Sequence, residues 1–270
     1  MRKEEIYMNL EILVATMSQK NFDIINKMRI TSDAIIINQT DCHDYNEIKC
    51  NNHLIKFYSF KEKGVGLSRN NALMRSNADI CLFADDDVEY EKGYKDIIIK
   101  EFINHPYADV IIFNVPSTNS DPRQKDYIAK KWKRLHLFNC FRHGTFRVAI
   151  RTEKIKQNNI FFSVLFGGGS KYSAGEDSLF ISDCIRKKLK VYESEKIIGY
   201  VSHETSTWFE GYTEKYFIDK GAFYACFTKS FPFLWCLQFA IRRKNLYIKE
   251  IDFIKACYLM KQGIKLIRKG

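Results

Sequence analysis

The chain has 270 residues, of which 46% are hydrophobic and only four are prolines. This composition excludes a disordered protein and gives enough apolar surface for one large α/β domain with an appendage. The formal net charge of +11 predicts an anionic partner, such as a phosphate-bearing substrate, a nucleic acid or a membrane surface.

The eight cysteines include no Cys-x-x-Cys pair, and several fall at apolar positions of expected strands or helices. This pattern is typical of reduced core residues in a cytosolic protein. The group Cys42, His43, Cys50 and His53 matches no zinc-ligand spacing. No sustained apolar run follows the charged first residues, and the longest run, 231–241, is too short to cross a bilayer. We therefore expect neither a signal peptide nor a transmembrane helix.

Apolar runs alternate with helical segments along most of the chain. We expect strands at 10–15, 34–38, 55–58, 80–84, 109–115 and 146–150, and one or two short strands within 191–201. We expect helices at 22–28, 93–105 and 178–188, and a short helix or turn at 153–158. Strands and helices joined by short connections predict a mostly parallel, doubly wound sheet, with ligands beyond the carboxyl ends of its strands. Residues 42–53 are expected to form a polar loop, and the basic stretch 117–143 a solvated helical face.

Three carboxylates, Asp85, Asp86 and Asp87, directly follow the expected strand 80–84. Adjacent carboxylates repel one another strongly outside bulk water, and a divalent cation relieves that repulsion. Oxygen ligands of this kind suit Mg²⁺ or Mn²⁺. The alternative is a solvated acidic turn before the next helix. His203 follows a later apolar strand and is a candidate metal ligand, although a lone histidine is more often a packed residue.

Two glycine-containing stretches open helices elsewhere in the chain. Residues 64–73 carry Arg69, and a glycine-flanked helix start with an arginine suits a pyrophosphate, the alternative being an ordinary loop. The glycine-dense loop 166–175 indicates backbone that approaches or moves over a ligand. Glu176 and Asp177, which follow it, are either favourable charges at a helix N-terminus or a general base.

The segment from Lys229 to the end holds ten Lys or Arg residues and only two acidic residues. Phe253, Met260 and Ile264 fall on one face of an expected helix, and lysines lie off that face. Such a basic amphipathic helix lies on a membrane surface or packs on its own domain. The aromatic residues at 231–235 favour an anionic membrane, because aromatic side chains are well suited to the bilayer interface.

Five of these stretches, in order, resemble the family 2 glycosyltransferases of the GT-A fold, especially bacterial enzymes of capsule, exopolysaccharide or lipopolysaccharide synthesis. The resemblance spans about 10–208. The motifs are Ala15-Thr16, Ser68-Arg69-Asn70, Asp85-Asp86-Asp87, Gly175-Glu176-Asp177 and His203. The first strand departs from the common proline-containing start of the family.

This resemblance implies a GT-A domain at 1–212, with a nucleotide-binding half at about 10–115 and an acceptor half at about 116–212, followed by a helical basic extension at 213–270. It implies a nucleotide-sugar site formed by Ala15, Thr16, Asn38, Gln39, Arg69, Asn70, Asp85 and Asp86. Asp85 and Asp87 are similar to the outer pair of the Asp-x-Asp motif, which binds Mn²⁺ or Mg²⁺, and a register one residue earlier gives the metal role to Asp86.

The resemblance further implies inverting transfer of a sugar from a nucleotide-diphosphate donor, most often UDP-linked, to a glycan or lipid-linked acceptor. Asp177 would be the general base and Glu176 its partner toward the acceptor. We expect a cytoplasmic enzyme attached peripherally to the inner face of the membrane, without a nucleic-acid partner. The alternatives are a sugar-nucleotide nucleotidyltransferase, which ordinarily has a glycine-rich basic signature after its first strand, and a non-catalytic basic binding protein.

Overall fold

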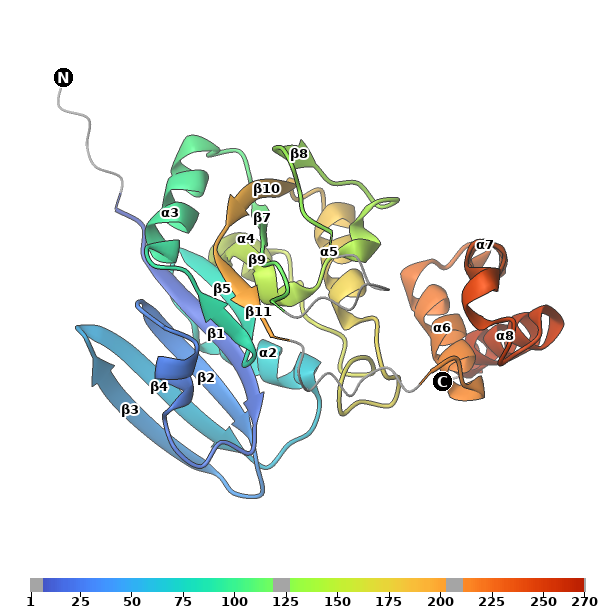
Figure 1. The fold of residues 1–270 in the computed structure, drawn as a ribbon, viewed down its shortest axis with the longest axis horizontal. Coiled ribbons are helices and arrows are strands. Elements are labelled where there is room, and N and C mark those ends of the chain that lie inside the picture. The colour runs from blue at the N-terminus through green and yellow to red at the C-terminus, as the bar shows by residue number, and fades with distance from the viewer. Residues whose placement is uncertain (1–6, 119–126, 203–210, 270) are drawn as a thin grey trace.

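The computed structural model describes residues 7–118, 127–202 and 211–269. Its centre is a nine-stranded sheet (Figure 1). In spatial order the strands are β3 (Asp44–Cys50), β4 (His53–Phe60), β2 (Asp33–Gln39), β1 (Leu10–Met17), β5 (Ile80–Asp85), β9 (Val148–Arg151), β7 (Val110–Asn114), β10 (Val191–Ile197) and β8 (Lys133–Arg134). The pairs β4–β2, β2–β1, β1–β5 and β7–β10 are parallel, whereas β3, β9 and β8 pair antiparallel with their neighbours. The predicted mostly parallel sheet is confirmed.

Helices cover both faces of this sheet, because successive side chains of each strand point to opposite faces. Alternate residues of β1, such as Ile12 and Leu13, therefore belong to two separate buried clusters. One face packs on α1 (Ile24–Lys27) and α3 (Tyr94–Asn104). The other packs on α2 (Val65–Arg75), α4 (Thr152–Gln157) and α5 (Glu176–Arg186). A small second sheet pairs β6 (Val88–Tyr90) with β11 (Gly199–Val201).

Two stretches differ from their predicted structure. Residues 44–50 form strand β3 instead of a loop. Asn51 and Asn52 both have positive φ and join β3 to β4 in a tight two-residue turn. The described part of 117–143 contains only β8 and the short 3-10 helix η1 (Cys140–Arg142). The prediction of a solvated helix in this stretch is therefore wrong. A second 3-10 helix, η2 (Thr145–Arg147), leads into β9.

The last residues form three helices beside the sheet, as Figure 1 shows in orange and red. They are α6 (Glu214–Phe227), α7 (Pro232–Tyr247) and α8 (Phe253–Lys269), and they share a hydrophobic cluster of their own. Gly221 and Gly263 let α6 and α8 approach closely, because a Cβ on either would overlap a backbone oxygen of the other helix. None of the described helices combines the length and apolar character needed to cross a membrane.

The predicted apolar face of α8 packs inside the protein. Met260 and Ile264 are buried, and Phe253, Cys257 and Ile267 pack on the same cluster. The sequence left open whether this apolar face lies on a membrane or packs on the protein. In the structure it packs on the protein, so it is unavailable to a membrane. The division into domains at residues 212 and 213 stays a prediction, and α6 begins immediately after it.

Candidate active site

The carboxyl ends of β1, β2 and β5 bring together several residues that were predicted to bind a nucleotide sugar. In the parallel register Thr16 lies opposite Asn38, and Ala15 lies opposite Asp85. Gln39 ends β2 at the same edge. The fold therefore places residues from three separate stretches of sequence at one edge, where open α/β sheets bind ligands.

Two of these residues have protein partners that organise the neighbouring loops. The Asn38 side-chain amide accepts a hydrogen bond from the backbone N–H of Gln19. It also donates one to the backbone carbonyl oxygen of Gln19, and both bonds are 3.0 Å long. Gln39 accepts a hydrogen bond of 2.8 Å from the N–H of Gly64, immediately before α2. These contacts stabilise the loop after β1 and the start of α2, and contact with a nucleotide stays a prediction for both residues.

The three consecutive aspartates have different partners. Asp86 accepts a short hydrogen bond from the Thr16 hydroxyl group, which ties the end of β1 to the turn after β5. Asp87 lies on the other side of this turn, where its carbonyl oxygen accepts a hydrogen bond of 3.1 Å from the N–H of Ser202. A cavity of about 100 Å³ opens beside Asp87. Of the three aspartates, Asp85 belongs to the charged cluster around Arg69.

Arg69 on α2 binds three carboxylates that come from two other elements. Its Nη2 donates to Asp85 Oδ1 at 2.7 Å, at the end of β5. Its Nη1 donates to Asp177 Oδ1 at 2.8 Å and to Glu176 Oε1 at 3.3 Å, both in the first turn of α5. The Arg69 side chain is only 3% exposed, so these ion pairs form with little competition from water.

Burial and charge change the ionisation of this cluster. Burial alone would lower the pKa of Arg69, but Asp85, Asp177 and Glu176 more than offset it and hold that pKa above its ordinary value. Burial, together with the charge of Asp177, raises the pKa of Glu176 to about 7 against the opposing effect of Arg69. One arginine therefore faces three carboxylates, of which Glu176 is partly protonated at neutral pH.

The raised pKa of Glu176 predicts a pH-dependent stability. Between pH 4.5 and about 7 the folded protein holds a proton on Glu176 that the unfolded chain has lost, so the free energy of unfolding falls as pH rises. Glu176→Gln removes this slope. We expect the unfolding free energy of the variant, measured in urea, to rise relative to wild type by up to about 3 kcal/mol across this window. If the difference in unfolding free energy between Glu176→Gln and wild type does not change with pH, the raised pKa of Glu176 is contradicted.

Thr145, which belongs to no sequence motif, also contacts Asp177. Thr145 is fully buried in η2, and its hydroxyl group donates a short hydrogen bond to Asp177 Oδ1, the same oxygen that Arg69 binds. Among the described residues, no hydrogen-bond donor contacts Asp177 Oδ2, and the side chain remains 28% exposed. Asp177 is thus held by one oxygen, which leaves the other able to accept a proton.

Asn70 and Phe162 fix the position of Arg69 from the side. The Asn70 amide group donates to the Phe162 carbonyl oxygen at 2.9 Å and accepts from its N–H at 2.8 Å. The Phe162 ring lies under the Arg69 guanidinium group at 5.4 Å. Asn70 therefore joins α2 to the segment before the glycine loop, and its predicted contact with a nucleotide stays a prediction.

The glycine loop packs closely on the protein itself. Gly167 has a φ of +100°, and a Cβ there would overlap the Glu176 carboxyl group and the Val65 side chain. Gly175 has a φ of +131°, and a Cβ there would overlap the Phe223 ring of α6. These contacts give one cause for the glycine density, because they set Glu176 between α2 and the C-terminal helices.

The described residues hold no group of three His, Cys, Asp or Glu side chains placed to bind a metal ion. The predicted ligand His203 lies outside the described residues. The oxygen donors of Asp85 and Asp87 suit Mg²⁺ or Mn²⁺, which proteins often hold through one or two carboxylates plus the phosphates of a substrate. Asp85 is paired with Arg69, and its role and that of Asp87 as metal ligands stay a prediction.

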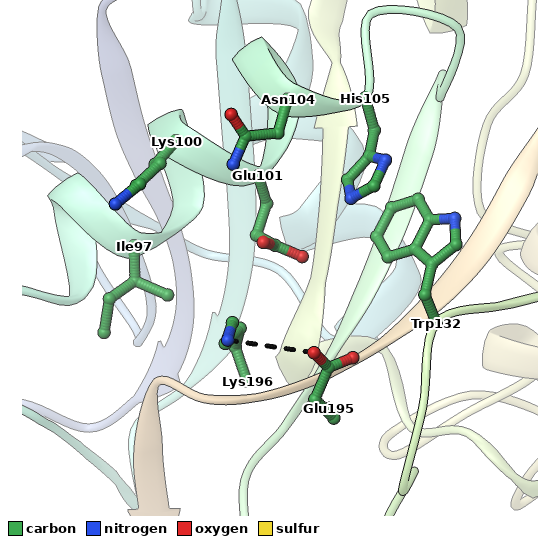
Figure 2. A pocket seen from close by; sticks show the side chains of 8 residues that line it. All are labelled: Ile97, Lys100, Glu101, Asn104, His105, Trp132, Glu195 and Lys196. Atoms are coloured by element: carbon green, nitrogen blue, oxygen red, sulfur yellow. Dashed lines mark ion pairs between the residues drawn. The ribbon is translucent and has the colours of Figure 1, made fainter.

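A larger cavity, of about 380 Å³, lies beside α3 and away from the Arg69 cluster (Figure 2). Its wall includes Trp132, and Glu101 points toward it. His105 stacks on Trp132 at 3.7 Å and Tyr192 stacks on it at 4.9 Å, both nearly parallel. Because both partners are stacked rings, Trp132 offers no open face for a sugar, and this cavity is not the candidate active site.

Part of the chain matches the model of one known protein family. Residues 39–166 match the family model described as glycosyl transferase family 2. This stretch includes Arg69 and the three aspartates, and it ends at the first residue of the glycine loop. A search of curated protein sequences gives no significant match.

The structure is similar to crystal structures of S. aureus TarS. Residues 1–349 of TarS in complex with UDP-GlcNAc superpose with a TM-score of 0.65 at 15% identity, over 97% of this chain and 90% of that one. The UDP complex of the same fragment gives 0.61 at 16% identity, over 97% and 89%. Against a longer TarS chain the TM-score is 0.62 at 16% identity, over 92% of this chain and 49% of that one. Residues 39–166 thus match glycosyl transferase family 2, and the chain as a whole has the GT-A fold of TarS.

Proposed function

We propose that this enzyme transfers a sugar from a nucleotide-diphosphate donor to a hydroxyl group of a glycan or a lipid-linked acceptor. The observation that carries the proposal is the Arg69 cluster. It joins Asp85, at the strand end where a donor would bind, to Asp177, at the start of α5. A donor site and a candidate base thus lie within the reach of one side chain.

The donor that we propose is UDP-linked. The support comes from TarS, which has the same fold and was crystallised with UDP-GlcNAc and with UDP. In this chain the base and ribose would lie at the ends of β1 and β2, near Ala15, Thr16, Asn38 and Gln39. Arg69, Asn70, Asp85 and Asp86 would complete the donor site.

For the metal we propose Asp85 and Asp87, with His203 as a further ligand and Mn²⁺ or Mg²⁺ as the ion. Ser202, the residue before His203 in the chain, is hydrogen bonded to the backbone of Asp87. A metal bound there would neutralise the negative charge of the departing diphosphate. The small cavity beside Asp87 includes Lys27, which adds positive charge at the same place.

Asp177 is the general base in this proposal. Its free oxygen, Oδ2, would take the proton from the acceptor hydroxyl group as that oxygen attacks the anomeric carbon. A single displacement from the opposite face inverts the configuration at that carbon. Glu176, partly protonated because of its raised pKa, would contact the acceptor.

We place the acceptor among bacterial surface glycans, either free or attached to lipid, and the enzyme at the inner face of the cell membrane. The positively charged C-terminal segment supports this location.

Calorimetric titration of the purified protein with UDP, GDP, dTDP and CMP, with and without Mn²⁺, tests the donor site. We expect one nucleotide, UDP, to bind tightly only when Mn²⁺ is present. Asp87→Ala should remove most of the metal-dependent gain, because it removes a carboxylate ligand of the ion. Asp96→Ala, an exposed aspartate in the first turn of α3, is the matched control and should bind as wild type does. Absence of binding to every nucleotide under both conditions would reject the proposed donor.

A further inference from the structure

The C-terminal helices expose an apolar stripe that the packing of the protein does not use. On α7, Leu234 and Ile241 are each 61% exposed, and Ile248 follows at the same seven-residue spacing. Residues seven apart lie on one face of a helix, so these side chains form a single stripe. The opposite face of α7, with Cys236, Ala240 and Tyr247, is buried against the other helices.

Positive charge accompanies this stripe. Arg242 and Lys244 are exposed beside Ile241, and Lys249 is exposed beside Ile248. The first turn of α8 adds Ile254, which is 79% exposed. Apolar side chains interleaved with basic ones along one exposed helix face are typical of a helix that lies in a membrane interface.

We propose that the exposed face of α7, with Ile254, docks on an anionic lipid bilayer. Docking buries the apolar side chains among the acyl chains and sets the basic side chains against lipid phosphates. The apolar face of α8 is not part of this surface, because it packs on α6. The proposed contact therefore lies on α7, which begins within the aromatic stretch 231–235, and not on the apolar face of α8.

Charge argues against the other occupants of this face. A second copy of the chain would bring two segments together, each with ten basic and two acidic residues, and these would repel. A nucleic acid would be attracted by the charge but would leave the exposed Leu234 and Ile241 without apolar partners. An anionic bilayer accounts for both features.

The docked helices would also place the active site. Asp219 on α6 accepts hydrogen bonds from the backbone N–H and the hydroxyl group of Ser173, at 2.9 and 2.8 Å. Phe223 of α6 packs against Gly175. The helical unit therefore holds the loop that leads to Glu176, so a bilayer under α7 would bring a lipid-linked acceptor near it. This last step rests on the proposed function, whereas the docking itself does not.

Co-sedimentation of the full chain with phosphatidylcholine vesicles, with and without phosphatidylglycerol, tests the proposal. We expect binding only to the vesicles that contain phosphatidylglycerol. Arg242→Glu with Lys244→Glu should weaken this binding at least about 30-fold. Leu234→Ser with Ile241→Ser should weaken it about tenfold or more, through lost apolar burial. Lys92→Glu with Lys100→Glu, exposed residues at α3, is the matched control and should bind as wild type does.

Three outcomes would overturn the proposal. They are no binding of the wild-type chain, equal binding of both α7 variants and wild type, and concentration-dependent self-association that Leu234→Ser with Ile241→Ser abolishes. The last outcome would assign the stripe to a second copy of the chain. The experiment contains no donor or acceptor, so it separates failure of docking from failure of the proposed transfer reaction.

Discussion

Replacing Arg69 with methionine is expected to lower the free energy of unfolding at neutral pH by about 3–5 kcal/mol. Methionine keeps most of the side-chain volume but leaves Asp85, Glu176 and Asp177 without the cation that they share. Removing one partner of a buried ion pair leaves uncompensated charge, which costs more than the pair itself contributes. Urea unfolding measures this loss, and thermal unfolding should show it as a decrease of roughly 10 °C in Tm.

The loss should depend on pH in a defined direction. Burial already raises the pKa values of Asp85 and Glu176, and without Arg69 they rise further in the folded protein, so the penalty grows as pH rises through them and shrinks as pH falls. Arg75→Met, on the same helix, is the matched control. Arg75 donates hydrogen bonds to the carbonyl oxygen and side chain of Asn71 and stacks on aromatic rings, and it has no carboxylate partner among the described residues. Equal losses in the two variants, or a loss independent of pH, would show that the cluster does not need its arginine.

Much of the sheet could be predicted because its strands are apolar. The runs that became β1, β2 and β5 are nearly all buried, and such runs bounded by polar turns indicate strands of a parallel sheet. Strand β3 gave no such signal. It lies at the edge of the sheet with mostly exposed polar side chains, and its turn rests on two asparagines with positive φ.

The candidate site was only partly predictable, for a different reason. Arg69, Asp85 and Asp177 were each selected from local motifs, but their common cluster depends on pairings across 16 and 108 residues of sequence. Local pattern does not contain such pairings. Thr145 and Phe162 belong to no motif at all, and only the fold brings them to Asp177 and Arg69.

Asp177→Asn is expected to reduce the rate of sugar transfer by a factor of about 10²–10⁴, the usual contribution of a general base. Asparagine has the same shape, and its amide oxygen can still accept the hydrogen bonds of Arg69 and Thr145, so folding and nucleotide affinity should change only a few-fold. A transfer assay together with calorimetric titration of UDP measures both quantities. Asp183→Asn, at a half-exposed position of the same helix, should leave transfer unchanged. Undiminished transfer by Asp177→Asn would remove this residue from the chemistry.

Thr145 provides an independent test of the same base. Thr145→Val replaces the hydroxyl group with a methyl group of similar size, so the ionised carboxylate loses one donor and becomes less stable. The acid limb of the pH–rate profile should therefore move to higher pH, and kcat should fall about tenfold with KM little changed. Thr145→Ser restores the donor and should restore the profile. A role in packing alone would give the opposite order, because serine leaves a cavity that valine fills.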